Sequence, residues 1–165
     1  MRVVIVLAII LGLCVWIARA YSTSNPVGKA TGGGGAAGDH VWHSSWETAA
    51  AKATASKRPI LADFTGSDWC GWCIKLKEEV FDTPEFESWA ARSVVLLEID
   101  FPKSKSQSQE DKIANTQLVQ KYDVKGFPTI LMLNPDGTVI GKLGYRPGGA
   151  KTWIQAAEEI IAKGG

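Results

Sequence analysis

The chain is 165 residues long, carries 18 basic and 17 acidic side chains, and has a hydrophobic content of 45%. A net charge this close to zero gives no electrostatic basis for binding nucleic acid or an anionic membrane surface. The length allows one compact domain with terminal extensions and is too short for two domains of ordinary size.

The N-terminus has the three parts of a secretory signal peptide. A basic start at Arg2 precedes an apolar run over residues 3–17, and Ala18-Arg19-Ala20 forms a small-x-small cleavage site. The run is shorter than the about 20 residues needed to span a bilayer as a helix, which favours cleavage, with a retained signal anchor as the alternative. In both cases residues 1–20 are expected to direct the chain to the periplasm or cell envelope. Membrane attachment is expected only if residues 3–17 are retained.

Residues 21–40 are small, polar and glycine-rich, with four consecutive glycines at 32–35. Such a composition buries too little apolar surface to offset the entropy of ordering, so we expect a flexible tether. The folded domain is then expected over residues 41–165. Without residues 1–20 the chain has 16 basic and 17 acidic side chains, because two arginines lie in that segment.

Helical and strand-like segments alternate through the domain. The predicted helices cover residues 46–57, 70–80, 110–122 and 150–162, with a further short helix that begins at Pro84. The predicted strands cover residues 60–64, 93–100, 129–133 and 138–143, the last two joined by a turn at 134–137. This order predicts an α/β fold with a central mixed β-sheet and helices on both faces.

Two cysteines, Cys70 and Cys73, lie three residues apart between a predicted strand and a predicted helix, and Cys14 is the only other cysteine. This placement is expected of a thiol–disulfide redox site. The N–H groups and the positive dipole end of a helix start would lower the pKa of Cys70. Residues three apart are neighbours on a helix, so Cys73 can attack the mixed disulfide that Cys70 forms with a substrate. Cys70 is therefore the predicted nucleophile and Cys73 the resolving thiol.

Two other roles fit the cysteine pair less well. A four-ligand zinc site needs two further ligands, and the only histidines, His40 and His43, are expected at the domain edge in the tether. A disulfide that closes so small a loop stabilises a fold little. A structural disulfide and a metal site therefore stay as alternatives to redox chemistry, and no metal is expected.

The run from Trp69 to Cys73 between a strand and a helix, followed by Gly126-Phe127-Pro128-Thr129 before the third strand, resembles the thioredoxin family. The likeness covers about residues 41–163. The segment from Phe64 to Cys73 looks most like that of exported or lipid-anchored thioredoxin-like proteins of bacteria. The resemblance implies a thioredoxin-like fold and a thiol–disulfide oxidoreductase that needs no bound cofactor. It implies as partners the disulfides or dithiols of other exported proteins and an upstream redox partner.

The same resemblance assigns substrate-binding residues. Pro128 would be a cis-proline that faces the cysteines, and the backbone of Phe127 would pair with an extended substrate segment. Trp69, Gly71 and Trp72 would complete the substrate-binding surface. Trp72 either contacts a partner or covers the second cysteine, and the sequence leaves both roles open.

Asp63 interrupts an apolar strand and is the third predicted catalytic residue. A buried carboxyl there would have a raised pKa and could pass a proton to Cys73, a task that thioredoxins give to an acidic residue at this position. The interval from Asp63 to Cys70 is one residue longer than in thioredoxin, and apolar Leu96 stands where a lysine is often found. A solvated aspartate at the strand edge is the alternative.

Together these features predict an exported, monomeric thiol–disulfide oxidoreductase that acts on cysteine pairs of other exported proteins. Tryptophan rather than histidine between the cysteines favours a reductant over an oxidant. One alternative is a thioredoxin-like binding module that holds cysteine-bearing partners with little turnover. Another is a copper or zinc carrier that uses the cysteine pair with a histidine.

Overall fold

The computed structural model describes residues 40–164, so the predicted signal segment 1–20 and residues 21–39 of the predicted tether lie outside the described residues. The strands are β1 (Trp42–His43), β2 (Ile60–Thr65), β3 (Val95–Asp100), β4 (Thr129–Leu133) and β5 (Val139–Leu143). The helices are α2 (Trp46–Ser56), α3 (Gly71–Leu76), the π-helical segment η1 (Lys77–Phe81), α4 (Pro84–Ser93), α5 (Gln109–Lys121) and α6 (Gly149–Gly164). Within residues 40–164, no helix has the length and apolar character needed to cross a membrane.

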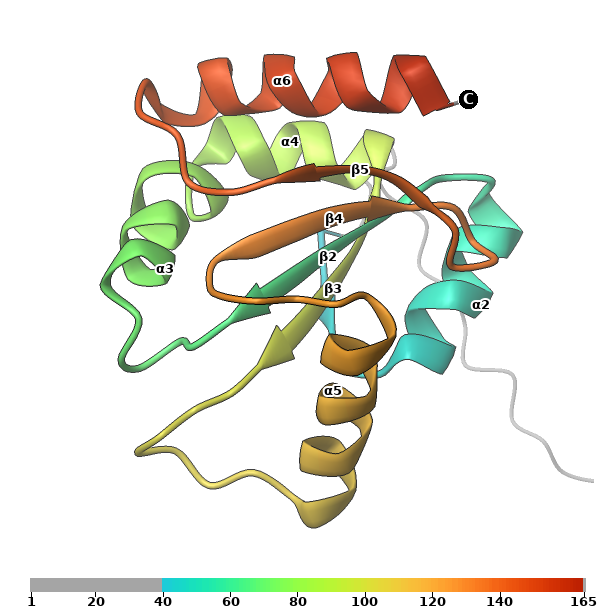
Figure 1. Ribbon diagram of the computed structural model, residues 1–165. Helices are drawn as coiled ribbons and strands as arrows, with labels where there is room; N and C mark the ends of the chain where they lie inside the picture. Colours follow the sequence, from blue (N-terminus) through green and yellow to red (C-terminus); the bar gives the residue numbers. More distant parts are fainter. Residues whose placement is uncertain (1–39, 165) are drawn as a thin grey trace, which may run out of the picture. The chain divides into compact units, whose positions relative to one another are not determined.

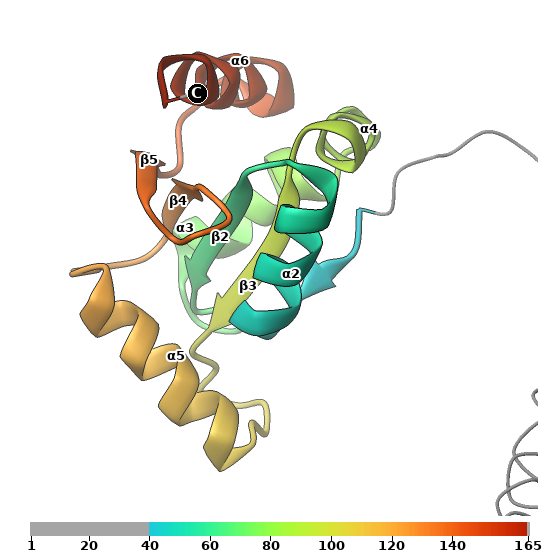
Figure 2. The same cartoon turned by 90° about the vertical axis from the view of Figure 1, so that its right-hand side faces the viewer.

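The five described strands form one mixed sheet in the order β1-β3-β2-β4-β5 (Figures 1 and 2). β1, β3 and β2 run parallel, whereas β4 is antiparallel to β2 and β5 is antiparallel to β4. The parallel pairing of β2 with β3 sets Asp63 opposite Glu98 and Thr65 opposite Asp100. The predicted mixed sheet with flanking helices is confirmed.

The sheet separates two apolar cores, because successive residues of a strand point to opposite faces. Helices α3, α4 and α6 and segment η1 cover one face, and α2 and α5 cover the other (Figure 1). Leu61 of β2 packs in the first core, around the fully buried Trp153, while Phe64 packs in the second. By the same alternation Asp63 faces α3, the helix that carries Cys73.

Three helices begin at a hydroxyl side chain that accepts a hydrogen bond from a backbone N–H of the first turn. These caps are Ser45 for α2, Thr83 for α4 and Ser108 for α5. Each cap satisfies an N–H donor that has no partner within the helix, and each contributes about 1 kcal/mol to the stability of the fold. The helix predicted to begin at Pro84 is therefore confirmed, with proline at its first position.

The sequence does not predict β1. Two residues, Trp42 and His43, are too few to show the alternation of a strand, and they form one only by pairing with Leu96 and Leu97 of β3. His43, expected at the edge of the domain, therefore lies in the sheet.

Other boundaries also differ from the prediction. The helix expected over residues 70–80 divides into α3 and the wider turn of η1, which ends at Phe81. Hydrophobic periodicity does not separate these forms, because both place residues three to five apart on one face. The strand expected from Ser93 begins at Val95, because α4 extends through Ser93.

Candidate active site

Cys70 is the N-cap of α3 and forms a disulfide bond with Cys73. The backbone N–H of Cys73 donates a hydrogen bond to the Sγ of Cys70 at 3.3 Å. This donor belongs to the first turn of the helix, where N–H groups lack partners within the helix. After reduction the same donor would stabilise a thiolate on Cys70, as the predicted nucleophile requires.

The turn before the first cysteine is held by contacts with the end of β3. Asp100 accepts hydrogen bonds from the backbone N–H of Ser67 at 2.9 Å and from its hydroxyl at 2.6 Å. The indole of Trp69 packs over Gly66, where a Cβ would lie 2.5 Å from the ring. The indole N–H also donates to the carbonyl oxygen of Phe101 at 2.7 Å. Glycine at position 66 is therefore required by the close approach of the tryptophan.

Asp68 forms hydrogen bonds with the loop that follows β3. Its carboxylate accepts backbone N–H hydrogen bonds from Lys103, Ser104 and Lys105 at 2.9, 2.6 and 3.1 Å. These bonds, first of all the one from Lys103, hold the pKa of Asp68 below its usual range. The loop is thus tied to the segment that carries the cysteine pair, although it lies far from that segment in the sequence.

Aromatic rings line one side of the cysteine motif. Phe127 stacks on Phe101 with 5.3 Å between ring centroids and meets Trp69 edge-on at 6.2 Å. Lys103 Nζ lies 4.0 Å from the Trp69 ring, which keeps 42% of its surface exposed. The peptide bond between Phe127 and Pro128 is cis, as the resemblance implies. Trp69 and Phe127, both predicted to bind substrate, are therefore in contact.

Trp72, between the cysteines, is the most exposed of the large hydrophobic side chains in residues 40–164, at 58%. Its ring lies 5.0 Å from that of Tyr145, and Lys75 Nζ is 5.5 Å from the indole. The Tyr145 hydroxyl donates to Glu79 at 2.8 Å. Beside it, a Cβ at Gly71 would meet no atom within 4 Å, so this part of the motif faces open space.

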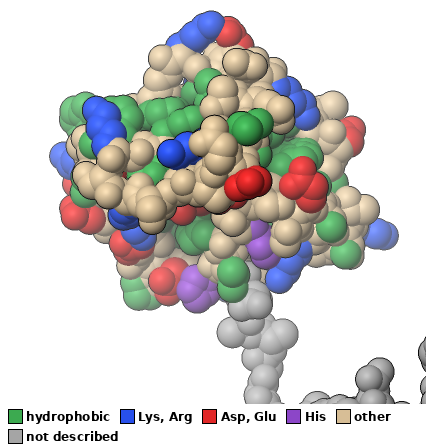
Figure 3. Space-filling model, turned by 90° about the horizontal axis from the view of Figure 1, so that it is seen from below, with side chains coloured by type: hydrophobic (Ala, Val, Ile, Leu, Met, Phe, Trp, Pro, Cys, Tyr) green, Lys and Arg blue, Asp and Glu red, His purple; other side chains and the backbone are tan. Residues whose placement is uncertain are grey.

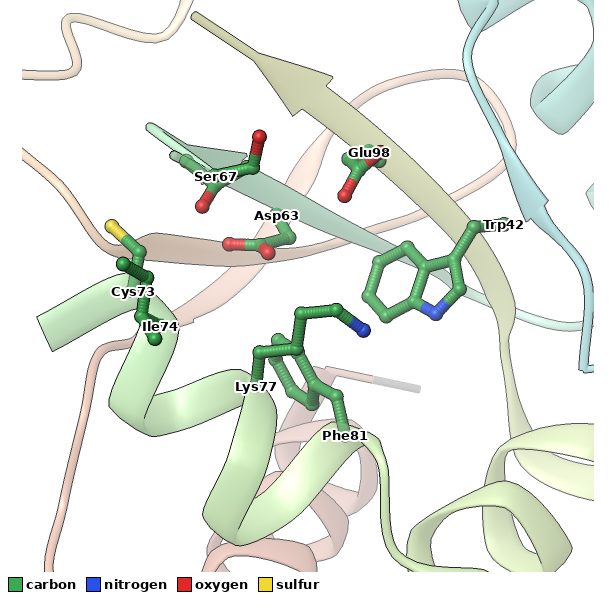
Figure 4. Close-up of a pocket in the computed structure, with 9 residues that line it drawn as sticks. Trp42, Asp63, Ser67, Cys73, Ile74, Lys77, Phe81 and Glu98 are labelled. Atoms are coloured by element: carbon green, nitrogen blue, oxygen red, sulfur yellow. The ribbon is translucent and has the colours of Figure 1, made fainter. Parts of the chain in front are cut away.

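Asp63 is buried, which excludes the alternative of a solvated strand-edge carboxylate. It lines a cavity of about 240 Å³ together with Cys73, Lys77 and Glu98 (Figure 4). Burial, together with the smaller effects of the negative charges of Glu98 and Asp100, raises the pKa of Asp63 to about 8, and the positive charge of Lys77 acts in the opposite direction. A carboxyl with this pKa exists in both protonation states near neutral pH, so in the cavity that it shares with Cys73 it can either accept or donate a proton.

The polar neighbours of Asp63 are not among the predicted site residues. Leu96, which occupies the position of the usual lysine, is buried in the core, and the cation comes from Lys77 on η1 instead. Glu98 lies opposite Asp63 through the register of two parallel strands. The alternation of side chains along β3 could have predicted that Glu98 points to the face covered by α3. Its place beside Asp63, however, follows only from the register between β2 and β3.

On the face shown in Figure 3, acidic and basic side chains lie interspersed. Among residues 40–164, no group of three or more His, Cys, Asp or Glu side chains is placed to hold a metal ion.

The sequence matches the family model of a thioredoxin-like domain over residues 46–157. The disulfide bond reductase DsbH of Chlamydia pneumoniae is 33% identical over 119 residues, which cover 70% of this chain and 72% of the relative. The thioredoxin-related protein DsbJ of the same organism is 30% identical over 63% of this chain, and the match covers 30% of that protein.

Solved structures agree with these sequence matches. A DsbH oxidoreductase superposes with a TM-score of 0.71 at 28% identity, over 88% of this chain and 98% of that one. The oxidised C-terminal domain of DsbD from Neisseria meningitidis superposes with a TM-score of 0.52 over 68% of this chain and 90% of that one. At 20% identity the second likeness shows the fold alone.

Proposed function

Because the chain belongs to the thioredoxin-like family of bacterial thiol–disulfide oxidoreductases, we propose that it is an exported reductant of disulfide bonds in other exported proteins. The observation that carries this proposal is the cavity in which Cys73 and the buried Asp63 lie together. The reducing direction is supported by a relative that bears the name of a disulfide bond reductase. Trp72 also adds no positive charge that would stabilise a Cys70 thiolate and make the site more oxidising.

The proposed reaction has two exchange steps. The Cys70 thiolate attacks one sulfur of a substrate disulfide, which forms a mixed disulfide and releases the other substrate sulfur as a thiolate. Cys73 then loses its proton to the Asp63 carboxylate and attacks the sulfur of Cys70. The substrate leaves with both sulfurs reduced, and the protein is left oxidised, with a Cys70–Cys73 disulfide. An upstream dithiol returns the protein to the reduced state by the reverse exchange.

The surface around the cysteines supports binding of an extended polypeptide. Exposed aromatic surface at Trp69 and Trp72 lies on either side of Cys70 along the chain, and Gly71 leaves the motif open. The half-buried Phe127 precedes the cis-proline, where its backbone would pair with a substrate strand. Backbone pairing demands no particular side chain, so a reductant of many different exported proteins can use it.

The redox potential of the full chain tests the direction of the reaction. Equilibration with a dithiothreitol or glutathione series is expected to give a potential near −270 mV, the value of thioredoxin, rather than near −120 mV, the value of a strong oxidant. In parallel, the protein is expected to reduce insulin catalytically with dithiothreitol as electron donor.

Two results would contradict this function. A potential near −120 mV would make the protein an oxidant, because its reduced form would then be the stabilised one. A reversible cysteine couple without insulin turnover would instead favour the binding module that holds cysteine-bearing partners.

Export by residues 1–20 is a separate part of the proposal. It is supported by the basic start, apolar run and small-x-small site of that segment. In bacterial cells the full chain is expected in the periplasmic or envelope fraction, and a variant without residues 1–20 in the cytoplasmic fraction. Recovery of both proteins from the cytoplasm would overturn the assignment. Mass spectrometry of the exported protein then distinguishes cleavage after Ala20 from a retained anchor.

A further inference from the structure

Asp63 has a carboxyl partner on the neighbouring strand. Glu98 is its register partner in the parallel pair β2–β3, so both side chains emerge side by side on the face covered by α3. Figure 4 shows the Asp63 carboxyl between Cys73 and Glu98 at the wall of one cavity. Two carboxyls so placed disfavour each other's ionised form, because like charges repel strongly where water is scarce.

A buried acid that moves protons needs a route to solvent. The Oδ1 atom of Asp63 is buried and has no hydrogen-bond partner among the described residues. The cavity of about 240 Å³ has room for several water molecules beside this atom. Glu98 lines the same cavity but is only half-buried, so its carboxyl can exchange protons with both the cavity and the solvent.

Negative and positive charges act on Asp63 from opposite walls of the cavity. From β3, Glu98 and Asp100 act on Asp63 as negative charges. From η1, Lys77 acts as a positive charge while its amine also pairs with Asp82 at the surface. Lys105 on the loop after β3 acts on Glu98 in the same direction as Lys77.

We propose that Glu98 is a positioning residue of the exchange reaction, whose negative charge makes the Asp63 carboxylate a stronger proton acceptor and whose carboxyl relays protons between Asp63 and solvent. This inference rests on the proposed function. When Cys73 resolves the mixed disulfide, its thiol proton passes to the Asp63 carboxylate, then through water to the Glu98 carboxylate, and finally to solvent. When an upstream dithiol opens the protein disulfide, the protonated Asp63 gives its proton to the departing Cys73 thiolate and is reprotonated through Glu98. Lys77 opposes Glu98 and limits how strongly Asp63 holds its proton.

Two substitutions with opposite electrostatic signs test the proposal. The titration of the Asp63 carboxyl carbon is followed by NMR in the oxidised full-length protein, together with the pH profile of insulin reduction. Glu98→Gln is expected to move the Asp63 midpoint to lower pH and Lys77→Met to higher pH, each by about half a unit or more. Glu98→Gln is also expected to slow insulin reduction at pH 7 about threefold to tenfold. Glu78→Gln, which removes an exposed carboxyl on η1, is the matched control and is expected to change neither.

A double variant separates a relay from a merely structural role. If Glu98 acts through Asp63, adding Glu98→Gln to Asp63→Asn changes the remaining rate less than about twofold. If the rate loss of the double variant equals the product of the losses in the two single variants, the proposal is overturned. It is also overturned if the pH profile of insulin reduction by Glu98→Gln coincides with that of Glu78→Gln. A shifted Asp63 midpoint with an unchanged rate overturns the proton relay as well. An unmodified protein that fails to reduce insulin contradicts the proposed function instead, and the NMR titration still reports whether Asp63 and Glu98 are coupled.

Discussion

Serine in place of Cys73 is expected to stop turnover and to trap the protein in a mixed disulfide with its substrate. The Cys70 sulfur still lies at the start of α3, where the first-turn N–H supports its thiolate, so the first attack on a substrate proceeds. Without the second sulfur no internal thiol can release the substrate. Insulin reduction should fall at least about 1,000-fold, because removal of a covalent catalytic group eliminates the catalysed route.

Two variants with the same side-chain change serve as controls for this experiment. Cys70→Ser is expected to lose turnover as well, but without a mixed disulfide, because the attacking sulfur is gone. Cys14→Ser, which alters the cysteine of the N-terminal run, is expected to leave insulin reduction within about twofold of the unmodified rate. Non-reducing mass spectrometry detects the trapped species. Accumulation of the adduct in Cys70→Ser rather than in Cys73→Ser would reverse the proposed order of attack.

Asparagine in place of Asp63 is expected to make the oxidised protein more stable at alkaline pH. Burial raises the pKa of Asp63 from its ordinary 3.8 to about 8, so the folded state holds this proton more tightly than the unfolded chain. The stabilisation from the bound proton is fully present below about pH 4 and is lost as the pH rises toward 8. The slope is about 1.4 kcal/mol per pH unit, which amounts to a loss on the order of 5 kcal/mol.

The expected signature is a difference that grows with pH. In urea unfolding with the disulfide intact, the stability gain of Asp63→Asn over the unmodified protein should increase by about 3 to 4 kcal/mol between pH 5 and pH 8. Asp111→Asn changes an exposed carboxyl on α5 and should show no such increase. A pH-independent difference for Asp63→Asn would mean that Asp63 does not titrate between pH 4 and 8. The same variant is expected to slow insulin reduction, because Cys73 loses its proton partner.

Much of the fold could be predicted from local patterns. Apolar runs bounded by proline, aspartate and glycine identify β2, β4 and β5 to within one residue, and hydroxyl caps mark the starts of α2 and α4. The two-residue strand β1 could not be predicted, because it exists only by pairing with β3. The π-helical turns of η1 were equally inaccessible, because the periodicity of apolar residues is compatible with both helix types.

The candidate site also has a part that the sequence predicts and a part that it does not. The pair Cys70 and Cys73 follows from residue types and spacing, and Asp63 follows from a charged residue in an apolar strand. The partners of these residues could not be predicted, because they come from distant segments. Tyr145 reaches Trp72 from the chain before α6, and the Asp68 carboxylate binds backbone groups of the loop after β3.

The sequence by itself determined that Cys70 and Cys73 lie together, because two cysteines three residues apart at a helix start are neighbours wherever that helix lies. It also determined the family, since the cysteine motif and the Phe127–Pro128 segment together are specific. Only the tertiary structure decided the surroundings of Asp63. Strand register sets Glu98 beside it, and helix packing brings Lys77 to the opposite wall. Burial and the distances between charges set a carboxyl pKa, and both are properties of the packed chain rather than of any local sequence.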